Sequence, residues 1–205
     1  MSPVAELIVG PGTKLPEGLQ TPSRATYDGA QLAQALHGDY LAAALRQKLF
    51  VAAVQAGVTS SVGLATTYTG LVVSNPIGSL VNLAIMRIGL AQSVINAAVN
   101  AFGYGGGIHT TTQVVHTTPV APRNCFLGAP AGVALADVAA TLPIAPTYME
   151  FFSDTPGATT NPVPQFLELR GSLVVPPGGF VCTLAIAASP AAALWPSIMW
   201  EEIPI

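Results

Sequence analysis

The sequence predicts a mainly β protein: a jelly-roll-like antiparallel β-sandwich, preceded by an extended N-terminal arm and one or two short N-terminal helices. Three observations favour this fold class. Apolar and polar residues alternate with period 2 near the C-terminus, and 20 glycines and 18 prolines supply turn signals between segments rich in Val, Thr, Ile and Leu. The length of 205 residues suits one sandwich. We therefore expect an arm over residues 1–27 and a single domain over residues 28–205.

The arm is predicted from its prolines. Pro3, Pro11, Pro16 and Pro22 follow one another at intervals of five to eight residues, with glycines between them. Proline lacks a backbone N–H and fixes φ, so this spacing blocks helix propagation and removes donors from a β ladder. Residues 1–27 are therefore expected to be extended and to contact a partner through these prolines.

One helical segment follows the arm, over residues 30–49. Its apolar residues recur at the 3–4 spacing of a helix face. Gly38 is expected to divide this segment, with Asp39 as the N-cap of the second helix. The residues of the apolar face are Leu32, Leu36, Tyr40, Leu41, Ala44 and Leu45.

The next segments are predicted as strands because they are rich in Val, Thr, Ile and Leu. Ser74, Asn75, Pro76 and Gly78 form a strong turn signal between two of them. Residues 126–146 are rich in Ala, Pro and Gly and are expected to form a loop or a short helix. The predicted strands span residues 51–59, 65–73, 80–90, 111–120 and 147–153.

The clearest pattern is a predicted C-terminal hairpin. Residues 167–175 place Leu167, Leu169, Leu173 and Val175 on one strand face, and Glu168, Arg170 and Ser172 on the other. The turn Pro176-Pro177-Gly178-Gly179 is expected to lead into an antiparallel partner over residues 180–186. A last strand over residues 197–203 places Ile198 and Trp200 on one face, which brings the total to about eight strands.

The charge content is unusually low. The chain has 7 Lys and Arg and 10 Asp and Glu, a net charge of −3, so it lacks the basic surface that nucleic-acid binding requires. A monomer of this size exposes about 9,000 Å², so charges are sparse, and much of the surface is expected to consist of neutral Thr, Ser, Asn and Gln or to be covered by a partner. Residues 49–149 carry only Arg87, Arg123 and Asp137. That span is expected to supply the core and the main subunit contacts.

Membrane insertion and export are not expected. Residues 49–86 and 88–122 are uncharged and long enough to cross a bilayer, but Gln, Ser, Thr and Asn are scattered through them and no Lys/Arg cluster flanks them. Glu6 stands where a signal peptide has a basic region. With only Cys125 and Cys182, the simplest expectation is synthesis in a cytoplasm without export.

No pattern predicts catalysis, a cofactor or a metal. Gly105-Gly106-Gly107 is not part of a phosphate-binding motif and is expected to be a flexible turn. His37, His109 and His116 are scattered, and no G-x-S-x-G nucleophile motif occurs.

The remaining reactive side chains have structural explanations. Cys125 and Cys182 lie in apolar contexts. Glu201 and Glu202 are adjacent, so in a strand they point to opposite faces. Residues 154–157, Asp-Thr-Pro-Gly, are expected to form a turn.

Arg87 and Arg170 stand out as lone charges within apolar strands. An unpaired buried guanidinium is costly, so each must face water or meet a carboxylate. Glu168 is the expected partner of Arg170 because both lie on the same strand face. Both arginines are therefore candidates for a role in the fold or between subunits.

Two segments resemble virion structural proteins of tailed bacteriophages. They are residues 69–83, Thr-Gly-Leu-Val-Val-Ser-Asn-Pro-Ile-Gly-Ser-Leu-Val-Asn-Leu, and the C-terminal end, with Pro-Gly-Gly-Phe at 177–180, Ala-Ala-Ser-Pro at 187–190 and Trp-Glu-Glu-Ile-Pro at 200–204. The nearest likeness is to β-rich head decoration, or cement, proteins. The resemblance implies a jelly-roll or sandwich subunit, usually trimeric, on a capsid lattice or another virion surface.

The resulting hypothesis is a non-enzymatic virion structural protein that packs as a homo-oligomer, with a trimer favoured, on the major capsid protein or another virion protein. An alternative is a tail-associated, receptor-binding or glycan-binding virion module, with Tyr104, Tyr148, Trp195 or Trp200 as stacking platforms. An enzyme of unknown type is the third alternative. Trp195 and Trp200 are also candidate contact residues in the first hypothesis.

Overall fold

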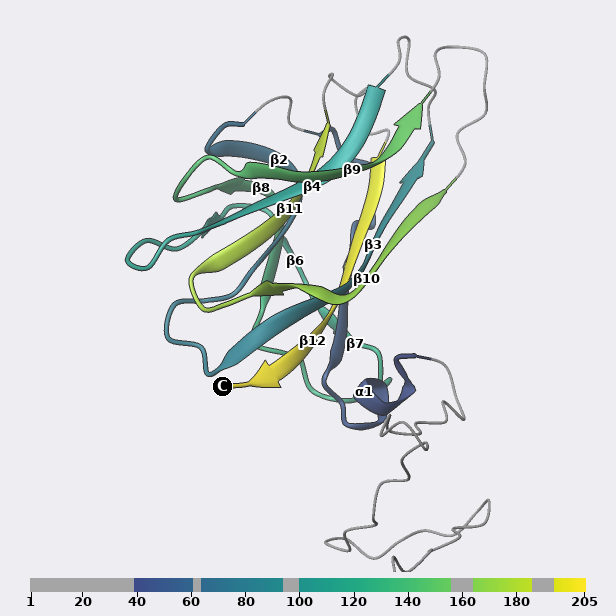
Figure 1. Cartoon of the computed structure of the whole chain (residues 1–205), viewed down its shortest axis with the longest axis vertical. Helices are drawn as coiled ribbons and strands as arrows, with labels where there is room; N and C mark the ends of the chain where they lie inside the picture. Colours follow the sequence, from purple (N-terminus) through teal and green to yellow (C-terminus); the bar gives the residue numbers. More distant parts are fainter. Residues whose placement is uncertain (1–38, 61–63, 94–99, 156–163, 186–193) are drawn as a thin grey trace, which may run out of the picture. The chain divides into compact units, whose positions relative to one another are not determined.

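The computed structural model describes residues 39–60, 64–93, 100–155, 164–185 and 194–205 (Figure 1). The chain divides into two units, residues 1–39 and residues 40–205, and the second contains nearly all of the described structure. The predicted arm with Pro3, Pro11, Pro16 and Pro22, and the first part of the predicted helical segment, lie outside the described residues.

The described chain is mainly β, with one short helix, α1 (Leu41–Leu45). The strands are β1 (Leu49–Ala53), β2 (Thr67–Ser74), β3 (Val81–Gln92), β4 (Asn100–Ile108), β5 (Val115–His116), β6 (Pro119–Val120), β7 (Arg123–Asn124), β8 (Leu135–Thr141), β9 (Thr147–Thr155), β10 (Gln165–Val175), β11 (Gly179–Ala185) and β12 (Leu194–Pro204).

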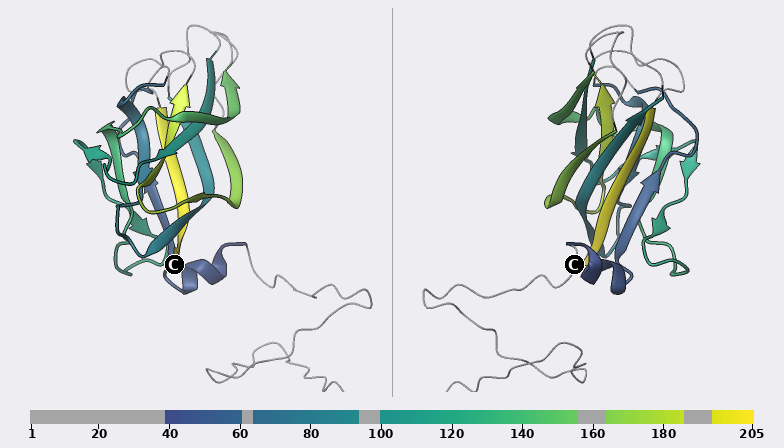
Figure 2. Two further views of the ribbon diagram at one scale, coloured as in Figure 1. Left: turned by 60° about the vertical axis from the view of Figure 1, so that its left-hand side comes forward. Right: turned by 90° about the vertical axis from the view of Figure 1, so that its right-hand side faces the viewer.

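The strands form two antiparallel sheets. One has the order β10-β3-β12-β1-β7, and the other has the order β5-β8-β2-β11-β4-β9, with β6 also paired to β8. The pairing is nested: β1 pairs with β12, β2 with β11, β3 with β10 and β4 with β9. The first four strands therefore run against the last four as one long antiparallel ribbon, which crosses from sheet to sheet at each connection (Figures 1 and 2).

The main core lies between the two sheets. Trp200 and Ile198 of β12 pack there with Ile85 of β3, Leu71 of β2 and Val181 of β11. The predicted inward face of the last strand is thus confirmed. Strands after residue 149 contribute to the core as well as strands of the low-charge span 49–149, because each of β1–β4 pairs with one of β9–β12.

A second apolar cluster lies on the outer face of the larger sheet. Val72 and Cys182 point away from the main core and pack with Val114 and Leu142, which flank the short strands β5, β6 and β8. Residues that flank β5 and β8 therefore cover part of the outer face of this sheet. As a result, every residue of β11 is buried.

The predicted C-terminal hairpin is wrong. The strands themselves are present as β10 and β11, and the alternation along β10 is confirmed, but β10 pairs with β3 and β11 pairs with β2 and β4. The turn at residues 176–178 therefore crosses between sheets. Alternation shows that one strand face is buried, but it does not identify the neighbouring strand.

The glycine run predicted as a flexible turn belongs to β4. A Cβ on Gly103 would lie 2.3 Å from the carbonyl oxygen of Glu150, and one on Gly105 would lie 2.5 Å from that of Thr147. Both acceptors are in β9, so the glycines allow β9 to approach β4 closely.

Three other boundaries differ from prediction. The segment 126–146 contains strand β8, and the predicted strand 111–120 is reduced to β5 and β6. Within the described residues, helix is confined to Leu41–Leu45, its N-cap is Tyr40 rather than Asp39, and β1 begins already at Leu49. The helix ends before Gln47, whose φ of 59° is left-handed, and residues 49–53 then pair with β12.

Asn75 joins two crossovers between the sheets. Its side-chain amide is buried and donates to the carbonyl oxygens of Val81 (2.8 Å) and Val175 (3.0 Å). Its backbone N–H donates to Gly179 and its carbonyl accepts from Gly178. The β2–β3 turn is thereby fixed to the β10–β11 turn, which confirms the predicted turn at residues 74–78 and shows its role.

Replacing Asn75 with Ala should destabilise the fold by about 3 kcal/mol, because two buried carbonyls lose their donor at about 1–3 kcal/mol each. Urea unfolding followed by tryptophan fluorescence measures this change. Ser79→Ala is the matched control, since it removes a hydroxyl that donates to Asn75 Oδ1 and should cost only about 1 kcal/mol. Equal losses for the two variants would contradict the role assigned to Asn75.

Candidate functional site

The two arginines singled out in the sequence lie on neighbouring strands, β3 and β10. The guanidinium of Arg87 lies 5.1 Å from the ring centroid of Phe166, a cation–π distance, and Glu168 is its partner in the β-sheet register. Glu168 also accepts a hydrogen bond from the Tyr40 hydroxyl. Arg170 is exposed at a bulge in β10, with a positive φ of 50°.

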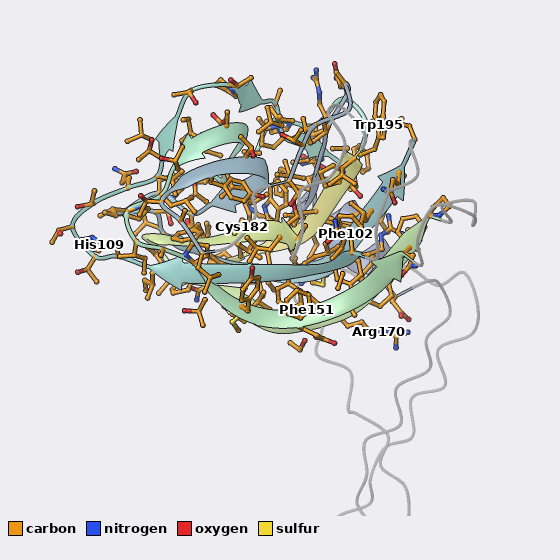
Figure 3. All side chains as sticks on the ribbon, turned by 90° about the horizontal axis from the view of Figure 1, so that it is seen from above. Phe102, His109, Phe151, Arg170, Cys182 and Trp195 are labelled. Atoms are coloured by element: carbon orange, nitrogen blue, oxygen red, sulfur yellow. The ribbon has the colours of Figure 1, made fainter. Side chains whose placement is uncertain are left out.

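The four candidate stacking aromatics do not form one surface. Trp200 has 0 % exposure and is a core residue, so it is not available as a platform. Tyr104 is buried, with its hydroxyl donating to Glu150 (3.2 Å). Tyr148 packs against Phe151, with ring centroids 5.1 Å apart. Trp195 is the exception, with 37 % exposure at the start of β12 (Figure 3).

Ser74, His116 and Asp137 form a cluster that the sequence does not predict. Ser74 Oγ lies 3.0 Å from His116 Nε2, and His116 Nδ1 lies 3.5 Å from Asp137 Oδ2. The three residues come from β2, β5 and β8, on the outer face of the larger sheet. They stand in the order of a Ser-His-Asp triad, which no sequence spacing reveals because the segments are far apart in the chain.

The geometry of this cluster suits a structural role. Asp137 has no exposed surface, and its carboxylate accepts backbone N–H groups from Thr118 (3.0 Å) and Ala139 (2.6 Å). Ser74 is only 5 % exposed, whereas a nucleophile must contact its substrate. At 3.5 Å, His116 and Asp137 attract each other without a strong hydrogen bond. The cluster therefore fastens residues 115–119 to the sheet.

The two cysteines are unpaired thiols. Burial raises the pKa of Cys182 strongly and that of Cys125 to a smaller extent, where the positive charge of Arg87 opposes it. A raised pKa keeps both thiols protonated and therefore weakly reactive. In the described ranges, no three His, Cys, Asp or Glu side chains gather as a metal site would require.

The most distinctive surface is the side of the domain formed by β9 and β10, which we call the β9–β10 edge. Each strand is the last of its sheet, and both views in Figure 2 show them on the same side. Large apolar side chains are exposed along them, including Phe151 and Phe166 (44 % and 60 %). Figure 3 labels Phe151 and Arg170 along this side.

A groove of about 300 Å³ opens on the β9–β10 edge. It is lined by Met149 of β9, Leu173 and Val174 of β10, the glycines of β4, and Phe180 of β11. Thr147 supplies the only polar side chain among its lining residues. The groove is suited to aliphatic side chains and offers no charge to a polar ligand.

Comparisons with protein-family models, curated proteins and solved structures find no match to this chain. Among the residues that the structure describes, no helix has the length and apolar character needed to cross a bilayer. The candidate site is therefore defined by the chain's own geometry, and the β9–β10 edge is its strongest feature.

The Ser74–His116–Asp137 cluster predicts a pH-dependent stability. Burial lowers the pKa of His116 from its ordinary value of 6.5, although the Asp137 carboxylate opposes the shift. As the pH drops below 6.5, the imidazole of His116 becomes protonated in the unfolded chain before it does in the folded chain. The free energy of unfolding therefore falls as the pH drops from 6.5 through the folded-state pKa. Above pH 6.5 this contribution is fully present.

Replacing His116 with Gln should remove that part of the pH dependence and cost about 1 kcal/mol at neutral pH through the lost bond to Ser74. Urea unfolding at a series of pH values measures both effects. His109→Gln is the control, because the His109 imidazole accepts hydrogen bonds from the backbone N–H groups of Thr111 and Thr112 in its own loop. If the free energy of unfolding falls as steeply below pH 6.5 in His116→Gln as in the unchanged protein, His116 is not the source of this pH dependence.

Proposed function

We propose that this chain is a non-enzymatic virion structural protein, a capsid decoration or cement subunit that stabilises a shell by packing as a homo-oligomer. A trimer is the favoured assembly. The observation that carries the proposal is the β9–β10 edge, where both strands expose large apolar side chains and an apolar groove opens. Contiguous exposed apolar surface marks an interaction site.

The strand order supports the jelly-roll part of the proposal. Four strands in the order β10-β3-β12-β1 face four in the order β2-β11-β4-β9, and the nested pairs wrap one antiparallel ribbon into two sheets. Jelly rolls of eight strands are typical of viral capsid and lectin domains. The segment that carries β5–β8 is then an insertion, in which β5, β6 and β8 extend the larger sheet and β7 extends the smaller one.

The charge content supports self-association. A chain with 8 % charged residues has far fewer than the 25–35 % or so typical of well-behaved soluble surfaces. Obligate interfaces bury about 2,000 Å² or more, which would cover the exposed apolar residues of the β9–β10 edge. Residues 1–27 are proposed to order on a neighbouring subunit or on the shell protein and clamp it.

The whole chain should therefore have a solution mass of three times 20.9 kDa by light scattering at micromolar concentration. Deleting residues 1–24 should weaken attachment to the shell and leave the circular dichroism spectrum unchanged. A stable monomer would contradict the self-association, and loss of folding on deletion would show that the arm belongs to the core instead.

A receptor-binding or glycan-binding virion module is the second candidate, favoured by the exposed indole of Trp195. Aromatic faces of this kind stack on sugar rings. Under this alternative, Trp195→Ala should abolish binding to a glycan array while Phe166→Ala, a change at another exposed aromatic, should not. The copy number in purified virions separates the candidates, since a decoration protein is present in hundreds of copies and a receptor binder in few.

A further inference from the structure

We propose that the groove on the β9–β10 edge binds residues 4–9 of a second copy of this chain, as an added extended strand. This inference rests on the proposed function, because it requires copies to meet, and it names the contact between them. It follows from the chemistry of the groove, the unpaired sheet edges and the sequence of the N-terminal segment.

The groove selects an apolar occupant. Eleven residues line it, and only Thr147 among them has a polar side chain. A charged or strongly polar ligand would lose its hydration there without gaining a partner. Its volume of about 300 Å³ is at the lower end of ligand pockets, which span about 300–1,000 Å³, and suits a few aliphatic side chains.

The strands beside the groove favour an extended occupant. Among the described strands, β9 pairs only with β4, and β10 pairs only with β3. Each therefore has an outer edge at which an added strand can form backbone hydrogen bonds, the usual mode of strand addition. Bulges in both strands interrupt these edges, which favours a short segment over a full-length strand.

Residues 4–9 have the required sequence, Val-Ala-Glu-Leu-Ile-Val. In an extended chain Ala5, Leu7 and Val9 lie on one face, and Val4, Glu6 and Ile8 lie on the other. The apolar face can enter the groove while Glu6 stays in water. Pro3 and Gly10-Pro11 limit the strand to about six residues, because proline cannot donate to a ladder.

A second copy fits the surface better than the chain's own arm. Residues 10–38 can extend over roughly 95 Å, so reach permits either arrangement. Phe151 and Phe166 are exposed on the same edge but do not line the groove. A six-residue strand bound to its own chain would leave these two side chains exposed to water. A second copy that binds through its N-terminal segment also places its β-sandwich nearby, where it can cover them.

Disulfide trapping in the full-length chain tests this contact. In a Cys125→Ser background, chains with Leu7→Cys and a mass tag are mixed with untagged chains carrying Val174→Cys, then mildly oxidised. Tagged and untagged chains should become linked. Leu127→Cys, at an exposed position (91 %) that does not line the groove, replaces Val174→Cys as the control and should link roughly tenfold less, because binding raises effective concentration.

The outcomes separate this inference from the proposed function. Equal linkage at positions 174 and 127 in a protein that light scattering shows to be oligomeric would overturn the groove contact and leave the proposed function standing. A monomeric protein without linkage would overturn both. If one chain carrying both Leu7→Cys and Val174→Cys forms only an internal disulfide, the groove binds its own arm and the second-copy assignment is wrong.

A groove variant gives an independent measurement. Val174→Glu changes a half-exposed side chain, so the circular dichroism spectrum should stay unchanged while a carboxylate enters the apolar groove. Linkage between Leu7→Cys chains and Val174→Glu chains that carry Met149→Cys should fall at least to the Leu127→Cys level. Linkage equal to that of Met149→Cys alone would overturn the proposal.

Discussion

The buried amide of Asn75 is the contact on which the arrangement of the two sheets depends. Its two N–H donors reach Val81 at the start of β3 and Val175 at the end of β10, while its backbone pairs with residues 178 and 179 before and within β11. One residue therefore satisfies backbone groups of two crossovers. These crossovers are adjacent because β2 pairs with β11 and β3 pairs with β10, so each stabilises the other.

The nested pairing also decides which strands remain at the edges. β9 and β10 each have a described neighbour on one side only, and their exposed apolar side chains form the surface around the groove. β11, by contrast, lies between two strands and is covered on both faces by separate apolar clusters. The same topology that places β11 and β12 inside their sheets thus leaves β9 and β10 at the edges.

The outer face of the larger sheet shows how a catalytic-looking arrangement can serve stability. Ser74, His116 and Asp137 meet because β8 pairs with both β2 and β5, and the carboxylate of Asp137 accepts hydrogen bonds from backbone N–H groups. Ser74 Oγ and the Asp137 carboxylate have hydrogen-bond partners in a place where water is largely excluded, which is the condition for burying them. Substrate access, rather than the identity of the three residues, distinguishes this cluster from an active site.

The amino-acid sequence was enough to predict the mainly β class and the position of most long strands. Alternation along residues 167–175 and the Asn75 turn are local signals, so they could be predicted without a structure. Pairing could not, since the Pro176-Gly178 turn carries the same residues whether it joins neighbours or crosses between sheets. β4 was missed because its glycines have no side chain to show a pattern, and the Ser74–His116–Asp137 cluster was missed because its members are separated by long loops. Only tertiary structure decided these features, because each depends on contacts between distant segments.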